Sequence, residues 1–283
     1  MNRGGDGSSP LGARGRAVPA AITFRVQPRV QNWSQNERRR IITRSRAFTL
    51  LELLIVMALI TLLAALLLPG ISRSKQSARR VACAGNLRQL GLAGQMYWDD
   101  NSGQAFRWRG AATNDGQVYW FGWLQNGEEG KRSFDPRPGA LSSYLNGRGV
   151  EVCPAFYYLA PRLKLKATGA SYGYGYNLFL SAPSDQAPVN VHRVPDPSGL
   201  AFLADSAQVN TFQFPASPQN PMLEEFYYLN TNEPTAHFRH AKTANAVFCD
   251  GHVESERHAP NSLDTRLPGQ TIGRLRSEIL VVE

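Results

Sequence analysis

The chain has 283 residues and a formal net charge of +9 at pH 7. Residues 1–46 hold ten arginines against two carboxylates, whereas the rest of the chain has 21 basic and 20 acidic side chains. The nearly neutral remainder gives no support to nucleic-acid binding, and we expect no nucleic-acid partner. Without a leader and a membrane helix, about 200 residues are left, which suits one modest globular domain.

Residues 1–47 are rich in Gly, Ser, Pro and Arg and show little apolar periodicity, which predicts a disordered basic leader. Five of its arginines, at positions 38, 39, 40, 44 and 46, closely precede an apolar run. Basic residues beside a membrane helix favour the cytoplasmic side. We therefore expect a cytoplasmic N-terminus, a single pass through the inner membrane and an extracytoplasmic C-terminal domain.

Residues 48–68 form an apolar run whose only charged side chain is Glu52. A helix of this length is ~30 Å long, about the thickness of the hydrocarbon core of a bilayer, so the run predicts a transmembrane helix. A charged group inside lipid costs roughly 2.5–3.5 kcal/mol and by default suggests a functional partner. The alternatives are that Glu52 lies at the headgroup level or is protonated.

Residues 69–98 continue the helical pattern as an amphipathic segment, with apolar residues at helical spacing and basic residues between them. Pro69 predicts a kink where the helix leaves the membrane. The helix is expected to end near Asp99 and Asp100, where turn-forming residues begin. Oxygen ligands in such a loop suit calcium, and the alternative is that these residues only end the helix.

Residues 99–283 are predicted to form an extracytoplasmic antiparallel β domain with long loops, packed on the amphipathic half of the helix. The fold class is therefore α+β. No nucleophile with an adjacent base and no glycine-rich phosphate loop is visible, so we expect no enzyme. The expected strands lie at residues 117–123, 171–180, 199–204, 244–249 and 252–255.

Asp250 and Gly251 stand between two alternating segments, which predicts a two-residue hairpin of type I′. His237, His240, Asp250 and His252 could supply nitrogen and oxygen ligands to a divalent ion such as zinc. The alternatives are contact with a partner and a structural role, in which His240 hydrogen-bonds across the hairpin or to Asp205. No cofactor is required on this interpretation.

Cys83 and Cys153 would form a disulfide, which the extracytoplasmic space permits. Such a bridge would close a loop of about 70 residues and stabilise the domain by about 4 kcal/mol. The alternative is two buried free thiols. Cys249 is expected to be a small apolar residue of the core.

The segment Arg46 to Leu54, with the sequence RAFTLLELL, resembles the cleavage and methylation signal of type IV prepilins and type II secretion pseudopilins. The resemblance implies that a prepilin peptidase cuts between Ala47 and Phe48 and methylates the new N-terminus. It also implies that Glu52 pairs with the N-terminal amine of a neighbouring subunit. The family usually has Gly before the cut, so Ala47 implies slower cleavage.

The C-terminal pattern of His240, nine residues and then Asp250-Gly251 resembles the H-X9-DG motif of a prepilin-like subgroup abundant in planctomycetes and verrucomicrobia. Further parts of the chain share this resemblance, namely residues 83–93, 153–154, 171–174 and 204–206.

Together the two resemblances imply a pilin-like or pseudopilin-like structural subunit. It would be stored in the inner membrane and polymerised through its helix into a filament or pseudopilus, as a homo-oligomer or with other pilin-like subunits. The alternative is a single-pass membrane-anchored protein whose extracytoplasmic domain binds a ligand or metal.

Overall fold

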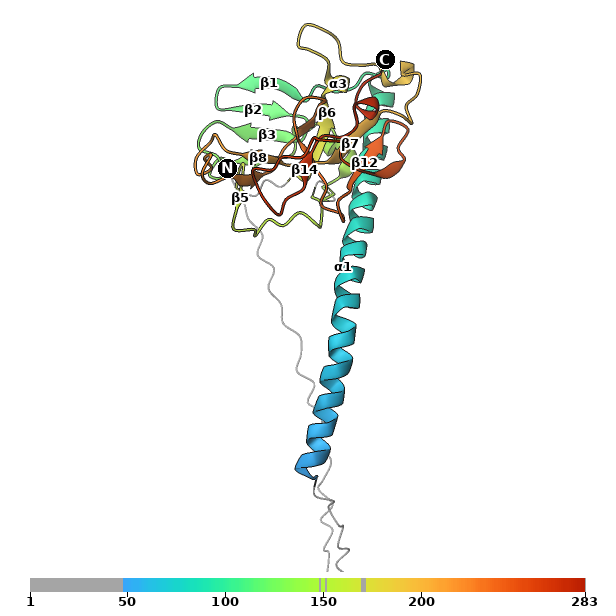
Figure 1. Cartoon of the computed structure of the whole chain (residues 1–283). Coiled ribbons are helices and arrows are strands. Elements are labelled where there is room, and N and C mark those ends of the chain that lie inside the picture. Colours follow the sequence, from blue (N-terminus) through green and yellow to red (C-terminus); the bar gives the residue numbers. More distant parts are fainter. Residues whose placement is uncertain (1–47, 148, 151, 169–171, 283) are drawn as a thin grey trace, which may run out of the picture. The chain divides into compact units, whose positions relative to one another are not determined.

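The computed structural model describes residues 48–147, 149–150, 152–168 and 172–282. The predicted leader therefore lies outside the described residues. Within them, a long helix is followed by short strands and loops (Figure 1). The elements are α1 (Leu50–Asp100), β1 (Arg109–Thr113), β2 (Gly116–Tyr119), β3 (Gly122–Gln125), β4 (Phe134–Asp135), α2 (Ser142–Leu145), β5 (Leu163–Lys164), β6 (Tyr174–Asn177), α3 (Leu178–Ser181), η1 (Val191–Arg193), β7 (Ala201–Asp205), β8 (Gln208–Asn210), β9 (Met222–Glu224), β10 (Tyr228–Leu229), β11 (Ala236–His237), β12 (Ala244–Phe248), β13 (Val253–Glu256), β14 (Ile272–Gly273) and η2 (Ser277–Ile279).

Helix α1 contains both halves of the predicted helix in one element. It continues through Pro69, which lacks an N–H group and so leaves one helical hydrogen bond unmade. The helix ends as predicted at Asp100, where Ser102 and Gly103 adopt positive φ values of 54° and 82°. The Gly103 N–H donates to the Trp98 carbonyl at 2.7 Å and closes the last turn.

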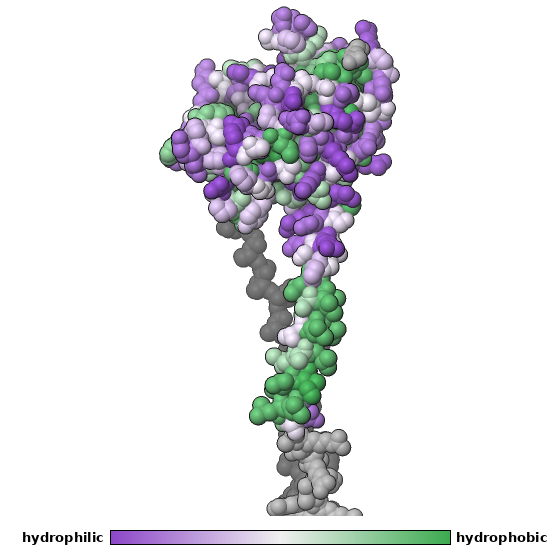
Figure 2. Space-filling model, viewed as in Figure 1, coloured by the Kyte–Doolittle hydropathy of each residue, from purple (hydrophilic) through white to green (hydrophobic). Residues whose placement is uncertain are grey.

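The side chains of α1 change from exposed to partly buried at Cys83. Residues 50–82 are exposed, and Figure 2 shows apolar side chains covering the N-terminal part of this stretch. Beyond it, one face of the helix packs against β7 and β12 of the domain. Only the later part of the amphipathic half expected at residues 69–98 is therefore buried, since residues 69–82 are exposed. The buried residues are Cys83, Leu87, Leu90, Gly91, Ala93, Gly94 and Trp98.

The largest sheet has five strands in the order β10-β6-β7-β12-β13. Its pairs are antiparallel except for β10 and β6, and a second parallel pair joins β5 to β9 in a three-stranded sheet. The expectation of a purely antiparallel sheet therefore needs correction, because the long loops between these strands allow parallel pairing. The two remaining sheets are antiparallel, with the orders β1-β2-β3-β4 and β11-β14. The fold class is α+β, as predicted.

Three of the local predictions differ from the structure. The expected strand at residues 117–123 is a hairpin of β2 and β3, with Trp120 and Phe121 in the turn between the paired residues Tyr119 and Gly122. The strand expected at residues 171–180 gives way to α3 from Leu178 onwards. The Asp250-Gly251 hairpin forms between β12 and β13, but only Gly251 has a positive φ. The Gly251 N–H donates to the Phe248 carbonyl at 2.9 Å, which corresponds to a turn ending in a glycine bulge and not to type I′.

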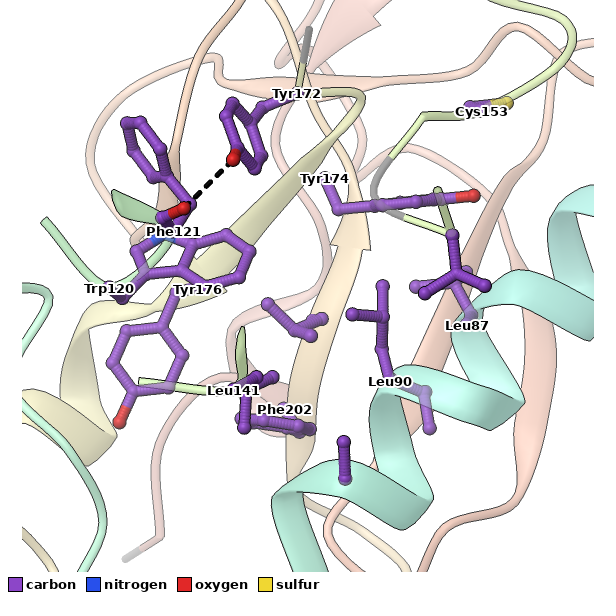
Figure 3. Close-up of a cluster of buried hydrophobic side chains, with 14 of the residues drawn as sticks. Leu87, Leu90, Trp120, Phe121, Leu141, Cys153, Tyr172, Tyr174, Tyr176 and Phe202 are labelled. Carbon is purple, nitrogen blue, oxygen red and sulfur yellow. Dashed lines mark hydrogen bonds between the residues drawn. The ribbon is translucent and has the colours of Figure 1, made fainter. Parts of the chain in front are cut away.

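Aromatic side chains fill the space between α1 and the sheets (Figure 3). Phe106 stacks on Tyr176 with a centroid distance of 4.5 Å, and Phe202 packs edge-on against Trp98 at 4.9 Å. Trp120 is buried, and its Nε1 donates to the Tyr227 carbonyl at 2.8 Å. Such pairs bury large apolar areas and fix the position of the outer half of α1.

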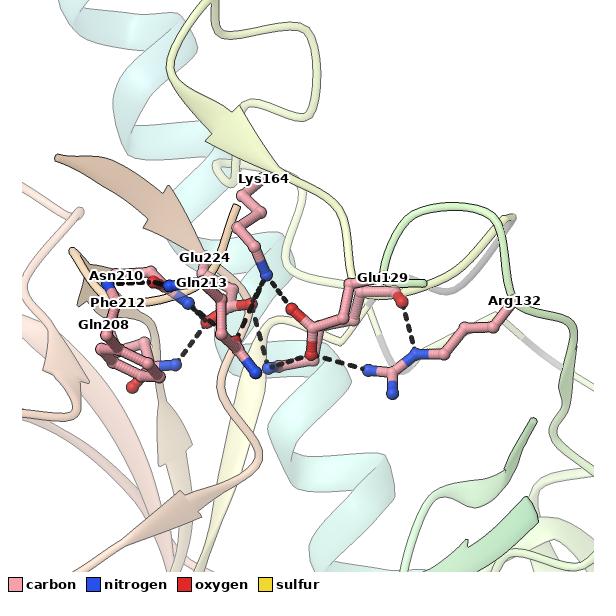
Figure 4. A network of polar contacts seen from close by, with 9 residues as sticks. Glu129, Arg132, Lys164, Gln208, Asn210, Phe212, Gln213 and Glu224 are labelled. Carbon is pink, nitrogen blue, oxygen red and sulfur yellow. Dashed lines mark hydrogen bonds and ion pairs between the residues drawn. The ribbon is translucent and has the colours of Figure 1, made fainter. Parts of the chain in front are cut away.

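Buried charges hold β5 against β9 (Figure 4). The Glu224 carboxylate accepts from Lys164 at 2.7 Å and lies 3.1 Å from the Lys166 ammonium. Lys164 also forms an ion pair with Glu129. Because a buried ion that loses its partner is costly, this network requires all of its members. Among the described residues it belongs to no group of metal ligands, and we assign it a structural role.

The close approach of α1 to β7 generates a stability prediction at Gly94. A Cβ atom on Gly94 would lie 2.5 Å from Cε1 of the buried Phe202 ring, so Gly94→Ala should overpack the core and cost about 1–3 kcal/mol. Gly85 has no atom within 4 Å of its Cβ position, so Gly85→Ala should stabilise the helix by up to about 1 kcal/mol. Denaturant unfolding in detergent should separate the two variants, and equal stabilities would contradict this packing.

A second prediction concerns Glu225, whose carboxylate accepts from the Tyr172 N–H at 2.9 Å. Burial raises the pKa of Glu225 from 4.5 to about 7. Its contribution to stability is therefore fully present below pH 4.5 and is lost as the pH rises through 7, a loss on the order of 3 kcal/mol. Glu225→Gln keeps the acceptor and should flatten this part of the pH profile of unfolding. An unchanged profile would contradict the raised pKa.

Candidate functional site

The start of α1 carries a reciprocal pair of hydrogen bonds between Thr49 and Glu52. The Thr49 N–H and hydroxyl each donate to Glu52 Oε2 at 2.9 Å, and the Glu52 N–H donates to Thr49 Oγ1 at 3.1 Å. This is a capping box, in which a threonine before the helix and a glutamate three residues later satisfy free N–H groups. The capping role was not predicted from the sequence, although the spacing of Thr49 and Glu52 is typical of a capping box.

Ala47, the residue before the expected cut, lies outside the described residues. Phe48 is described and is 72% exposed. From Leu50 onwards the apolar side chains remain exposed around the helix. Among the described residues, α1 is the one helix long and apolar enough to cross a membrane. The candidate processing site therefore stands directly before this helix.

The two ends of the motif from His240 to Gly251 occupy different places. His240 is buried, and its Nε2 lies 3.2 Å from Asp205 Oδ2, the contact named as one alternative in the sequence analysis. Gly251 lies at the tip of the hairpin against α1, where a Cβ would come within 2.9 Å of Gln95 Nε2. Both its positive φ of 90° and this close approach favour glycine.

The predicted ligand set of His237, His240, Asp250 and His252 is not brought together. His237 Nε2 lies 3.1 Å from the Gln270 side-chain oxygen, in a separate buried contact. His252 is at the hairpin, where its Nδ1 lies 2.6 Å from Asp250 Oδ1. The four residues are separated because the hairpin carries Asp250 and His252 away from the loop that holds His240.

Asp99 and Asp100 also do not form the predicted calcium loop, and within the described residues no group of three metal ligands includes them. Asp100 accepts from the Tyr144 hydroxyl at 2.9 Å, and Asp99 lies 3.2 Å from His192 Nε2. They end the helix, which was the alternative interpretation.

Cys83, Cys153, Asp205 and His240 form a buried cluster, and one potential ligand atom from each lies within 4.8 Å of all the others. The Cys83 thiol donates to Asp205 Oδ1 at 3.4 Å, and Cys153 Sγ lies 3.4 Å from His240 Nε2. The residues come from α1, from the loop before β5, from the end of β7 and from the loop after β11. All four residues were considered from the sequence, but their meeting in one site was not predicted.

Arg239 completes this cluster as a buried cation. Its Nε lies 3.7 Å from Asp205 Oδ1, and its Nη2 donates to the carbonyls of Gly173 at 3.1 Å and Ser206 at 2.5 Å. Although burial acts to raise the pKa of Asp205, Arg239 and His240 lower it below its usual value. Asp205 is therefore a buried carboxylate that is held in its charged form.

The pKa values of the two thiols in the cluster shift in opposite directions. A hydrogen bond with Cys83 and a second with His240 lower the pKa of Cys153 to about 6, whereas burial raises the pKa of Cys83. Burial acts to lower the pKa of His240, but Asp205 and Cys153 raise it to about 9. Both cysteines are free thiols in this structure, and their disulfide stays a prediction. Cys249 is buried, as expected.

The cluster does not have the geometry of a catalytic triad. A Cys-His-Asp relay needs the carboxylate on one imidazole nitrogen and the thiol on the other. Here His240 Nε2 is the nitrogen that faces both Cys153 and Asp205. All three side chains are also buried.

Comparison with known proteins identifies one match. Residues 42–68 match the family model of the prokaryotic N-terminal methylation motif, which covers the residues around Ala47, Phe48 and Glu52 and the apolar run after them. No curated protein and no solved structure matches the chain. The matched motif supports a prepilin-type protein with a single-pass membrane anchor, and it implies processing by a prepilin peptidase.

Proposed function

We propose that this protein is a non-enzymatic pilin-like or pseudopilin-like subunit that assembles through α1 into a filament or pseudopilus. The observation that carries the proposal is the methylation motif at residues 42–68, which includes the first part of a helix whose apolar side chains are exposed. The prepilin peptidase cuts between Ala47 and Phe48 and methylates the new amine. The other subunits are copies of this chain or other pilin-like proteins of a type II secretion or type IV pilus system.

Before assembly, the apolar part of α1 lies in the inner membrane. The arginines before it keep the leader in the cytoplasm, and the β domain lies outside. During assembly, the carboxylate of Glu52 pairs with the N-terminal ammonium of a neighbouring subunit. Pairing removes the cost of a lone charge in lipid, because intramembrane charges are tolerated when they are compensated.

A second candidate function is an anchored binding protein, in which α1 is only a tether. A cavity of about 670 Å³ favours this alternative. Basic residues of α1 and of the loop after β11 line it, and they suit an anionic ligand. These residues are Arg73, Arg79, Arg80, Arg239 and Lys242.

Processing is tested by intact mass and N-terminal sequencing of the chain extracted from membranes of a host with its prepilin peptidase. We expect a mature chain that begins at Phe48 and carries one added methyl group. Ala47→Gly should accelerate cleavage, because the resembled signals usually have glycine before the cut. A host without the peptidase is the control, and a leader retained in both hosts would contradict the proposal.

Assembly is tested by Glu52→Leu and Glu52→Gln, with Thr49→Val as the matched control. Gln can keep the hydrogen bond of the capping box but has no charge, whereas Thr49→Val removes the capping hydroxyl and keeps the carboxylate. We expect both Glu52 variants to reach the membrane at normal levels and to lose crosslinked multimers and filament recovery. Thr49→Val should assemble.

Two other outcomes would contradict this role of Glu52. If Glu52→Gln assembles while Glu52→Leu and Thr49→Val fail, the residue acts by capping the helix. If all variants behave like the wild type and remain in the membrane, α1 serves as a tether and the binding-protein alternative is favoured.

A further inference from the structure

We propose that Cys83, Cys153, Asp205 and His240 bind a divalent zinc-type metal ion that ties α1 to the β domain. Three of their separations are known from direct contacts. Cys83 Sγ lies 3.4 Å from Asp205 Oδ1, Cys153 Sγ lies 3.4 Å from His240 Nε2, and His240 Nε2 lies 3.2 Å from Asp205 Oδ2. In a tetrahedral zinc site with bonds of about 2.0–2.3 Å, neighbouring ligand atoms are ~3.5 Å apart.

The donor set selects the class of metal. Two thiolates and an imidazole are borderline-soft ligands that suit zinc, whereas calcium and magnesium prefer oxygen ligands. All four positions are supplied by the chain, so the site is of the closed, structural type without a place for a reacting water.

The surrounding residues balance the charge of such a site. Two thiolates and one carboxylate around a doubly charged ion leave a net charge of −1, and the buried guanidinium of Arg239 beside Asp205 offsets it. The Asn245 N–H donates to Asp205 Oδ2 at 2.8 Å, and the Tyr174 hydroxyl donates to Cys83 Sγ at 3.5 Å. Hydrogen bonds of this kind orient metal ligands.

In the described part of the chain, the guanidinium of Arg239 is not fully hydrogen-bonded. Among the described residues, its buried Nε and Nη1 atoms have no hydrogen-bond partner. A buried cation held in this way is stabilised by a neighbouring group of negative charge. The metal-loaded cluster, with its net charge of −1, is such a group.

Binding of the ion would join distant parts of the fold. Its ligands are spread from residue 83 to residue 240, and each comes from a different segment. The ion would therefore crosslink the first buried turn of α1 to the end of β7 and to two loops. His240 and Arg239 also line the 670 Å³ cavity, which offers the ion a route to the cluster from solvent.

The test uses the full chain, purified from membranes in detergent without added reductant or chelator, with metal content measured by inorganic mass spectrometry. We expect roughly one zinc ion per chain in the wild type and its loss in Cys83→Ser, Cys153→Ser and His240→Gln. Cys249→Ser and His237→Gln are matched controls, because these residues are equally buried but lie outside the cluster, and both variants should keep zinc.

Cobalt provides a readout that does not depend on how well a variant folds. Wild-type protein exchanged with Co²⁺ should show thiolate-to-cobalt charge-transfer bands and the visible absorption of tetrahedral cobalt. A non-reduced peptide linking Cys83 to Cys153 in most of the protein would overturn the proposal, because a disulfide consumes both thiolates. Wild-type protein that lacks zinc and binds no cobalt would overturn it as well. The proposal does not depend on filament assembly.

Discussion

The exposed apolar surface on the first half of α1 is the constraint on which the rest of the structure depends. Each buried leucine or isoleucine contributes about 1.5–3 kcal/mol, so a helix with this many exposed apolar side chains needs lipid or other helices around it. The same backbone continues without interruption into the half that packs on β7 and β12. The apolar half is therefore covalently joined to a folded domain through one continuous helix.

The domain holds the outer half of α1 at both ends of the H-X9-DG segment. Near Cys83, His240 contacts Asp205, and the Asn245 side chain donates to the Arg80 carbonyl at 3.2 Å. Twelve residues further along the helix, Gly251 approaches Gln95. These contacts are ~18 Å apart along the helix axis. The motif thus has a physical role in this chain, since one hairpin and the loop before it fix a long stretch of helix.

The sequence predicted the features that depend on local patterns. The apolar run, the helical spacing after Pro69 and the turn residues at Asp100 indicated α1, and Asp250-Gly251 indicated the hairpin. The turn type was wrong, because the pattern shows that glycine is needed but not which residues have positive φ. The cluster could not be predicted, because Asp205 and His240 meet Cys83 only through tertiary packing. Residues 204–206 were noted as part of a resemblance, but no rule of spacing connects them to the cysteines.

The capping box at Thr49 has a consequence for the energetics of subunit addition. In the described chain the Glu52 carboxylate already accepts two hydrogen bonds, and capping interactions of this type contribute about 1 kcal/mol. Both donors bind Oε2, so an incoming ammonium that binds this oxygen atom would compete with them. Subunit addition would then be an exchange of partners at one carboxylate, and its driving force would be the difference between two sets of bonds. Such an exchange would lower the net free-energy gain of the proposed assembly step, because each new bond replaces one that the chain already makes.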